Sequence, residues 1–160
     1  MTFSIAIPTA GARPCGDATA ALMLSELQKA HEDLNAAMAV MDTATRGEAP
    51  DRNLYSSARW RLSQASLKRR TLWRKNFEHM VAKACSKDAA ALQLLQSADA
   101  ELLHKSAAHV GKWTVNRIEA DWHGYREASR AIRREMELCI STEKRVLYPL
   151  LKQDAIGIRH

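Results

Sequence analysis

The chain has 160 residues, the length of one ordinary domain with room for a sizeable core. Good helix formers dominate its composition, only six Gly and four Pro occur, and no apolar run is long enough for a transmembrane helix. The net charge of +6 would suit an acidic partner. We expect it to serve solubility, because many of the 24 basic residues alternate with acidic ones.

The two ends of the chain are expected to lie outside the folded domain. Residues 1–16 have neither the basic start nor the apolar stretch of a signal peptide, so we expect a flexible arm there. We expect the domain over 17–153 and a C-terminal tail over 154–160. An odd number of cysteines without a CxxC pair argues against a disulfide scaffold and favours the reducing cytoplasm: Cys15, Cys85 and Cys139.

The first periodic segment runs from about Asp17 to Thr45. Its apolar residues recur at helical spacing and form one stripe: Leu24, Leu27, Leu34, Met38 and Met41. Gly47 and Pro50 then interrupt the pattern, which predicts a loop.

The second periodic segment runs from about Arg52 to Cys85. Its stripe is made of small and large apolar residues: Ala58, Leu62, Ala65, Leu72 and Met80. Further residues are expected to widen this apolar face: Trp60, Leu67, Trp73 and Phe77. The stretch Ser86-Lys87-Asp88 predicts a helix end and a new N-cap.

Two more periodic segments complete the chain. One runs from about Asp88 to Gly111, where we expect a break, and Thr114 is a candidate cap for the next element. The last begins within 114–121 and ends near Lys152. The stripe of the third segment is Leu92, Leu95 and Leu102, with Trp113 just beyond it. The stripe of the last segment is Trp122, Tyr125, Ile132, Met136, Val146 and Leu150. Four helices with short connections predict an all-α, antiparallel up-down-up-down four-helix bundle.

Polar residues fall on these apolar stripes, one set on each helix. The helical rise of about 1.5 Å per residue gives several of them a similar depth, and His109 a place nearer the opposite end. The sequence therefore predicts one buried polar layer, made of His31, Arg69, Asp99, Cys139 and Glu143.

Two interpretations of this layer follow from the cost of burying charge. In the first, Arg69 forms an ion pair with Glu143 or Asp99, and His31 is hydrogen-bonded beside them. In the second, the carboxylates and the histidine bind a metal ion, as such residues do in the cores of helical bundles. We favour the ion pair, because a guanidinium in the centre of the site would repel a cation.

The closing segment carries a family resemblance. Glu143 is followed by Leu147-Tyr148-Pro149-Leu150-Leu151, which resembles the last helix of the hemerythrin-like (HHE cation-binding) family. The stretch His31-Glu32-Asp33-Leu34 resembles the first ligand helix of that family. The segment Arg59–Ser63, and Trp113 with Asp121–Tyr125, resemble a bacterial subgroup. The resemblance covers about residues 18–152 and implies a hemerythrin-like bundle.

Most of the family's di-iron ligands are missing from this sequence. Cys139 stands where a His is expected, and the His-x-x-x-Glu pair of the second helix falls on Arg69 or Arg70, then on Trp73 or Arg74. On the third helix, His104 and His109 are five residues apart instead of four. Only His31 and Glu143 carry over. The resemblance thus implies a degenerate member, in which the Arg69 guanidinium supplies the positive charge that metal supplies elsewhere.

Three functions remain open at this point. We expect a non-enzymatic sensory, regulatory or protein-interaction module without a cofactor, whose partner is another protein or a second copy. The alternative is an O₂-, NO- or redox-responsive protein that binds iron or another divalent metal through His31 and Glu143. Its additional ligands would be Cys139, Asp99 or His109. The third is a binder of nucleic acid or another acidic partner through basic residues of the second segment: Lys68, Arg70, Arg74 and Lys75.

Overall fold

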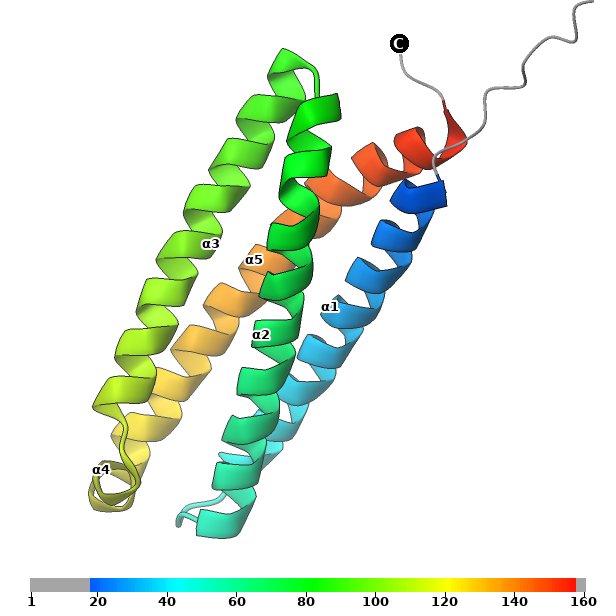
Figure 1. Cartoon of the computed structure of the whole chain (residues 1–160). Helices are drawn as coiled ribbons and strands as arrows, with labels where there is room; N and C mark the ends of the chain where they lie inside the picture. The colour runs from blue at the N-terminus through cyan, green and yellow to red at the C-terminus, as the bar shows by residue number, and fades with distance from the viewer. Residues whose placement is uncertain (1–17, 158–160) are drawn as a thin grey trace, which may run out of the picture.

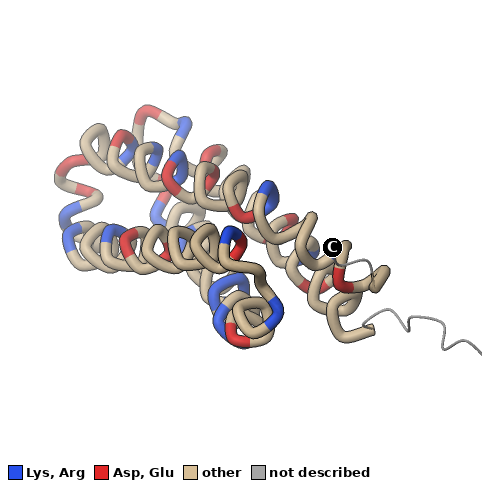
Figure 2. The backbone as a smooth tube through the Cα atoms, turned by 90° about the horizontal axis from the view of Figure 1, so that it is seen from above, with Lys and Arg blue, Asp and Glu red and all other residues tan. Residues whose placement is uncertain are grey.

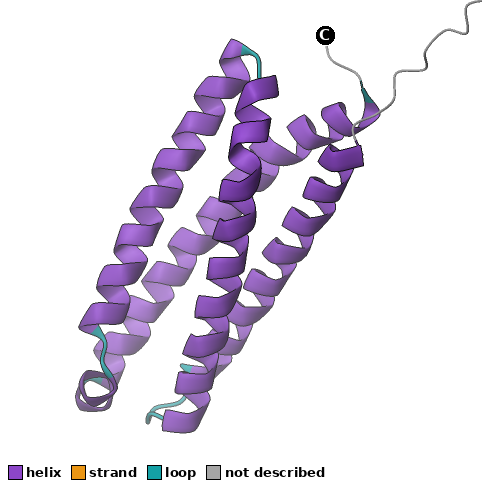
Figure 3. Ribbon diagram, in the orientation of Figure 1, coloured by secondary structure: helices purple, strands orange, loops and turns teal. Residues whose placement is uncertain are grey.

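The structure is a computed structural model that describes residues 18–157. These residues form five helices and no strand (Figures 1 and 3), which confirms the expected all-α class. The helices are α1 (Ala18–Ala44), α2 (Arg52–Lys83), α3 (Ser86–Lys112), α4 (Val115–Ala120) and α5 (Trp122–Ile156). The expected N-terminal arm, residues 1–16, lies outside the described residues. None of the described helices combines the length and the apolar character that crossing a membrane requires.

Four of these helices are long, and each runs in the direction opposite to the one before it (Figure 1). The helix α1 packs against α2 and α5, and α3 packs mainly against α5. Contact between α2 and α3 is much sparser, although these two helices are consecutive. The short helix α4 lies at the end where the chain passes from α3 to α5 (Figure 1). The sparse contact between α2 and α3 leaves space on that side of the molecule.

Short polar side chains begin three of the helices. Asp51 accepts a hydrogen bond from the backbone N–H of Leu54, with an O···N distance of 3.0 Å. Thr114 begins α4 in the same way, which confirms it as a cap. Asp121 ends α4 and also begins α5 by accepting from the N–H of Gly124 at 2.9 Å. The last helix, predicted to begin within 114–121, has its N-cap at Asp121, whereas the separate short helix α4 was not predicted.

The connection between α2 and α3 contains only Ala84 and Cys85, both with extended backbone. It has no Gly or Pro, and α3 begins at Ser86, ahead of the predicted Asp88. The helix α3 ends at Lys112, one residue beyond the break predicted near Gly111. Glycine in a helix costs only about 1 kcal/mol, which the surrounding helix tolerates.

The last helix is longer than predicted. It continues to Ile156, so residues 154–156 belong to α5 and not to a tail. Gly157 follows with a φ of 72°, the left-handed conformation that glycine adopts at low cost and that ends many helices. Figure 1 shows α5 bending toward its C-terminal end, and Pro149, which has no backbone N–H to donate, lies in that part.

Apolar side chains fill the space between the helices in three groups along the molecule. One group lies near the C-terminal end of α5 and includes Trp73 and Leu147. The middle group includes Leu34 and Met136, and the third contains Tyr55 and other aromatic residues near α4. On α5 the buried line continues through Leu147 and Leu151, whereas the predicted Val146 and Leu150 are half-buried.

Two predicted core residues of α2 face solvent instead. Trp60 is 68% exposed and Leu67 is 51% exposed. Each lies two positions from a buried residue of α2, Ala58 or Arg69, and two residues correspond to about 200° of helical rotation. Trp60 therefore does not widen the buried face as predicted, and Leu67 lies at its edge, partly open to solvent.

Candidate functional site

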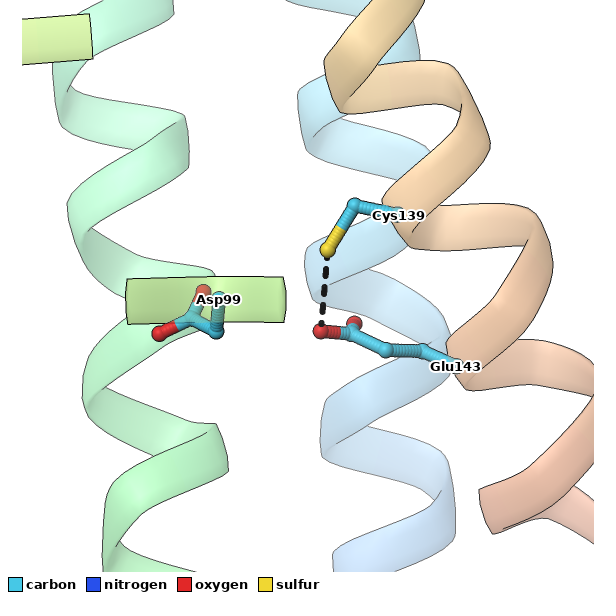
Figure 4. A group of neighbouring side chains, drawn as sticks. All are labelled: Asp99, Cys139 and Glu143. Carbon is cyan, nitrogen blue, oxygen red and sulfur yellow. Dashed lines mark hydrogen bonds between the residues drawn. The ribbon is translucent and has the colours of Figure 1, made fainter. Parts of the chain in front are cut away.

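The Arg69 guanidinium lies between two carboxylates in the middle of the molecule. Its side chain is 1% exposed. One terminal nitrogen, Nη1, donates to Oε1 of Glu143 on α5, and Nη2 donates to Oδ1 of Asp99 on α3 at 2.5 Å. Figure 4 shows Asp99 of α3 and Glu143 of α5 in this region, with Cys139 one helical turn before Glu143. Arg69 thereby connects three of the long helices.

His31 brings the fourth long helix, α1, into the same layer. Its Nε2 lies 2.7 Å from Oε2 of Glu143, and its Nδ1 lies 2.8 Å from the hydroxyl of Tyr148. An ionised carboxylate only accepts hydrogen bonds, so Nε2 carries the proton. A neutral imidazole then accepts the Tyr148 proton at Nδ1. Burial and the charge of Glu143 raise the pKa of Tyr148, which keeps its hydroxyl protonated as a donor.

The layer and its surroundings contain two guanidinium groups and two carboxylates. Arg70 contributes a second guanidinium, whose Nε lies 3.7 Å from Oδ2 of Asp99. Two guanidinium groups thus face the two carboxylates of Asp99 and Glu143. An added divalent cation would disturb this balance by two positive charges.

Arg69 stays charged although it is buried. Burial acts to lower its pKa, but the Glu143 carboxylate, Cys139 and the hydrogen bond to Asp99 together raise that pKa above its ordinary value. A buried charge of this kind is tolerated when it is both paired and hydrogen-bonded, and removing one partner is costly. The pairing of Arg69 therefore explains how the layer exists inside an apolar core.

The Cys139 thiol is protonated and unreactive in this setting. Burial, followed by the charge of Glu143, raises its pKa to about 12. Its Sγ lies 3.6 Å from Oε1 of Glu143 and donates to it (Figure 4). Because the thiolate is the nucleophile and the metal ligand, a thiol of this pKa is poorly suited to either role.

A metal ion does not fit this arrangement of donors. Ligand atoms of Asp99, Cys139 and Glu143 lie within 4.8 Å of one another. However, Arg69 already binds both carboxylates, and the thiol would have to lose its proton to coordinate a metal. A cation could enter only if the guanidinium left, so no chemical step is derived through a metal here.

Of the predicted site residues, the structure brings five into this layer: His31, Arg69, Asp99, Cys139 and Glu143. The sixth, His109, lies apart beside the ring of Tyr125, with 5.9 Å between ring centroids. Two residues that contact this layer were not predicted to do so. Tyr148 was noted only as part of the family-like closing segment, and Arg70 only as part of the basic surface of α2. Helical periodicity alone does not show how far such long side chains reach inward.

The predicted basic surface of α2 is partly engaged within the molecule. Lys68 pairs with Asp33 of α1 at 2.9 Å, and Arg70 is drawn toward Asp99. Arg74 and Lys75 remain exposed. Figure 2 shows acidic positions interspersed among the basic ones along the helices. Ion pairing inside the molecule accounts for part of the positive charge that an acidic partner would need.

Comparisons with protein-family models, with curated proteins and with solved structures found no match. We call the buried polar group of His31, Arg69, Asp99, Cys139 and Glu143 the Arg69 layer.

Proposed function

We propose that the chain is a non-enzymatic sensory, regulatory or protein-interaction module, built as an up-down-up-down four-helix bundle of the hemerythrin-like type. In this proposal an arginine ion-pair layer replaces the di-iron centre. The observation that carries it is the position of Arg69, whose guanidinium binds Asp99 and Glu143 together. A fixed guanidinium holds two carboxylates in place, which is the structural role that a bound cation would have.

The absence of catalysis in this proposal follows from the chemistry of the layer. His31 uses both ring nitrogens in hydrogen bonds, so neither is available as a general base. The Cys139 thiol has its pKa raised to about 12 and makes a poor nucleophile. Within the described residues, no second nucleophile is paired with a base in this layer. A stable, neutral network of this kind supports the fold and provides no reactive group.

Elemental analysis tests the proposal most simply. The protein would be expressed in medium supplemented with iron, zinc and manganese and purified without chelator. We expect far less than one metal ion per chain. The matched control is Glu143→Gln, which removes a carboxylate charge and should leave the metal content unchanged. A stoichiometric metal content in the wild type that falls in Glu143→Gln would overturn the proposal.

The second candidate function, a metal-dependent response to O₂, NO or redox state, is favoured by one observation. The potential ligand atoms of Asp99, Cys139 and Glu143 are close enough to share an ion once Arg69 is gone. Titration of Zn²⁺ into wild type and into Arg69→Ala therefore separates the candidates. Our proposal predicts that the wild type does not bind Zn²⁺. Any Zn²⁺ binding should occur in Arg69→Ala alone. Equal binding by both proteins would favour the metal-dependent function.

A further inference from the structure

A cavity of about 480 Å³ lies between α2 and α3, with α5 behind it. We call it the α2–α3 cavity. Its apolar wall includes Leu62, Leu103, Ile132 and Met136. This volume lies within the range of pockets that hold small organic molecules. The cavity coincides with the sparse contact between α2 and α3.

Small side chains leave the space between the two helices unfilled here. Ser63 and Ser66 of α2, and Ser106 and Ala107 of α3, line the cavity where larger residues would close it. Apolar residues at its rim remain open to solvent, because Leu67 is 51% exposed and Leu103 is 44% exposed. Exposed apolar surface beside a cavity marks a place where a ligand can remove that surface from water.

The charged groups of the cavity are all positive. Arg59 and Arg70 line it, and no Asp or Glu does. Arg70 is drawn toward Asp99 in the Arg69 layer, whereas Arg59 forms no ion pair within the described residues. The Arg59 guanidinium instead lies over the ring of Tyr125, with 5.8 Å to the ring centroid. Arg59 thus brings an unneutralised positive charge to a largely apolar cavity.

The same end of the cavity contains His109 and an unsatisfied donor. Burial, and after it the positive charges of Arg59, Arg133 and Lys112, together lower the pKa of His109 to about 4. His109 is therefore neutral near pH 7 and can donate a hydrogen bond. Oγ of Ser106, one turn before His109 on α3, is buried without a hydrogen-bond partner. A buried polar atom of this kind costs free energy until a ligand or a water satisfies it.

We propose that the α2–α3 cavity binds an organic monoanion with an apolar body, such as a medium-chain carboxylate. The carboxylate pairs with Arg59 and accepts hydrogen bonds from His109 and Ser106, while the chain lies along Leu62, Leu103, Ile132 and Met136 toward Arg70. This inference extends the proposed regulatory function by naming a ligand class. It is tested by ligand binding and not by metal content, so the two proposals can fail separately.

Isothermal titration calorimetry with three probes of equal chain length tests the ligand class. Decanoate is the anionic probe, decanol the uncharged one and decyltrimethylammonium the cationic one. We expect decanoate to bind about tenfold or more tightly than decanol, and the cationic probe not to bind. Equal binding of all three probes, or no binding of decanoate, overturns the proposal.

Two variants locate the site. Arg59→Met should weaken decanoate binding about tenfold or more and leave decanol unchanged, since only the charge is lost. The matched control is Arg61→Met, on the exposed side of α2 and outside the cavity. Ser63→Phe, which fills the cavity from an exposed position, should abolish binding of both probes. If neither variant changes decanoate affinity, the ligand binds elsewhere and the proposal is wrong.

A second copy of the chain could occupy the α2–α3 cavity instead of a small ligand. Analytical ultracentrifugation distinguishes these two occupants. We expect a monomer, with or without decanoate, whose mass is unchanged by Leu67→Ser. A dimer that dissociates in Leu67→Ser would show that the groove joins two chains, which overturns the ligand proposal.

Discussion

Arg69 and Arg59 belong to the same helix, α2, but their surroundings differ sharply. Arg69 is almost completely buried, and both ends of its guanidinium fork bind carboxylates. Arg59 lines the α2–α3 cavity and lies over an aromatic ring with no carboxylate beside it. The charge of Arg69 is paired with carboxylates of α3 and α5 and so connects three of the long helices. The charge of Arg59 remains available, which is the condition that a binding site requires.

The difference arises from the helices that α2 meets at each level. At Arg69, side chains from α1, α3 and α5 converge. Both terminal nitrogens of its guanidinium therefore find carboxylate partners, and His31 pairs with Glu143. At Arg59, the small residues Ser63 and Ser106 leave α2 and α3 apart. The polar groups at the level of Arg69 are paired, whereas Oγ of Ser106 in the cavity is buried without a hydrogen-bond partner in the described part of the chain.

The largest expected effect concerns Arg69. Arg69→Met should destabilise the protein by about 3–5 kcal/mol, because Glu143 and Asp99 are left as buried charges without their main partner. Urea unfolding followed by circular dichroism measures the loss. The matched control is Arg70→Met, whose guanidinium is hydrogen-bonded to neither carboxylate and should matter less. A neutral Arg69→Met would mean that the layer is not held by this pairing.

The next prediction concerns pH and belongs to the cavity. The pKa of His109 is lowered from 6.5 to about 4 in the folded protein. Between those values the unfolded chain binds the extra proton, so the stability contributed by His109 is present above pH 6.5 and is lost as the pH falls through 4. We expect a loss of about 1–3 kcal/mol from this residue.

Urea unfolding at several pH values, for wild type and for His109→Gln, measures this contribution. Between pH 6.5 and 4, the free energy of unfolding should fall more steeply with decreasing pH in the wild type than in the variant. Other carboxylates titrate equally in both proteins and cancel in the difference. Parallel curves would show that His109 does not sit beside the positive charges described.

A smaller effect is expected at the edge of the Arg69 layer. Tyr148→Phe removes the hydrogen bond from the Tyr148 hydroxyl to Nδ1 of His31 and should cost about 1 kcal/mol. Thermal unfolding detects a change of this size. A loss several times larger would indicate that Tyr148 holds the whole network, and no loss would place water at His31 instead.

The smallest effect is expected at Trp60. Because this side chain is 68% exposed, Trp60→Ser should change stability by less than about 0.5 kcal/mol. The matched comparison is Trp73→Ser, where 2% exposure predicts a loss of several kcal/mol, about 3–5. Similar losses in the two variants would mean that Trp60 is covered by a partner in solution.

Helical periodicity predicted the all-α class and the cap at Thr114, but not every boundary. The turn at Ala84 and Cys85 adjoins the helix end predicted over 86–88, although it has no Gly or Pro. The separate short helix α4 ahead of Asp121 was not predicted. Trp60 was predicted to be buried because it is a large aromatic residue. Its angular position on the helix, two residues from Ala58, was given too little weight.

The Arg69 layer could be placed from the sequence, whereas the α2–α3 cavity could not. Inward polar residues at one depth can be found from the helical rise, one helix at a time. A cavity depends on which residues face each other across two helices, so Ser63 and Ser106 become informative only when both are seen together. The neutral state of His109 likewise depends on Arg59 and Arg133, which are distant in sequence.

The central claim is that Arg69 and Glu143 stabilise each other inside the protein without a metal. A double-mutant cycle with Arg69→Met and Glu143→Leu, measured by urea unfolding in the presence of chelator, tests it most directly. We expect the double variant to be no less stable than either single variant, with a coupling energy of about 2 kcal/mol or more. Losses that simply add, within about 0.5 kcal/mol, would contradict the claim.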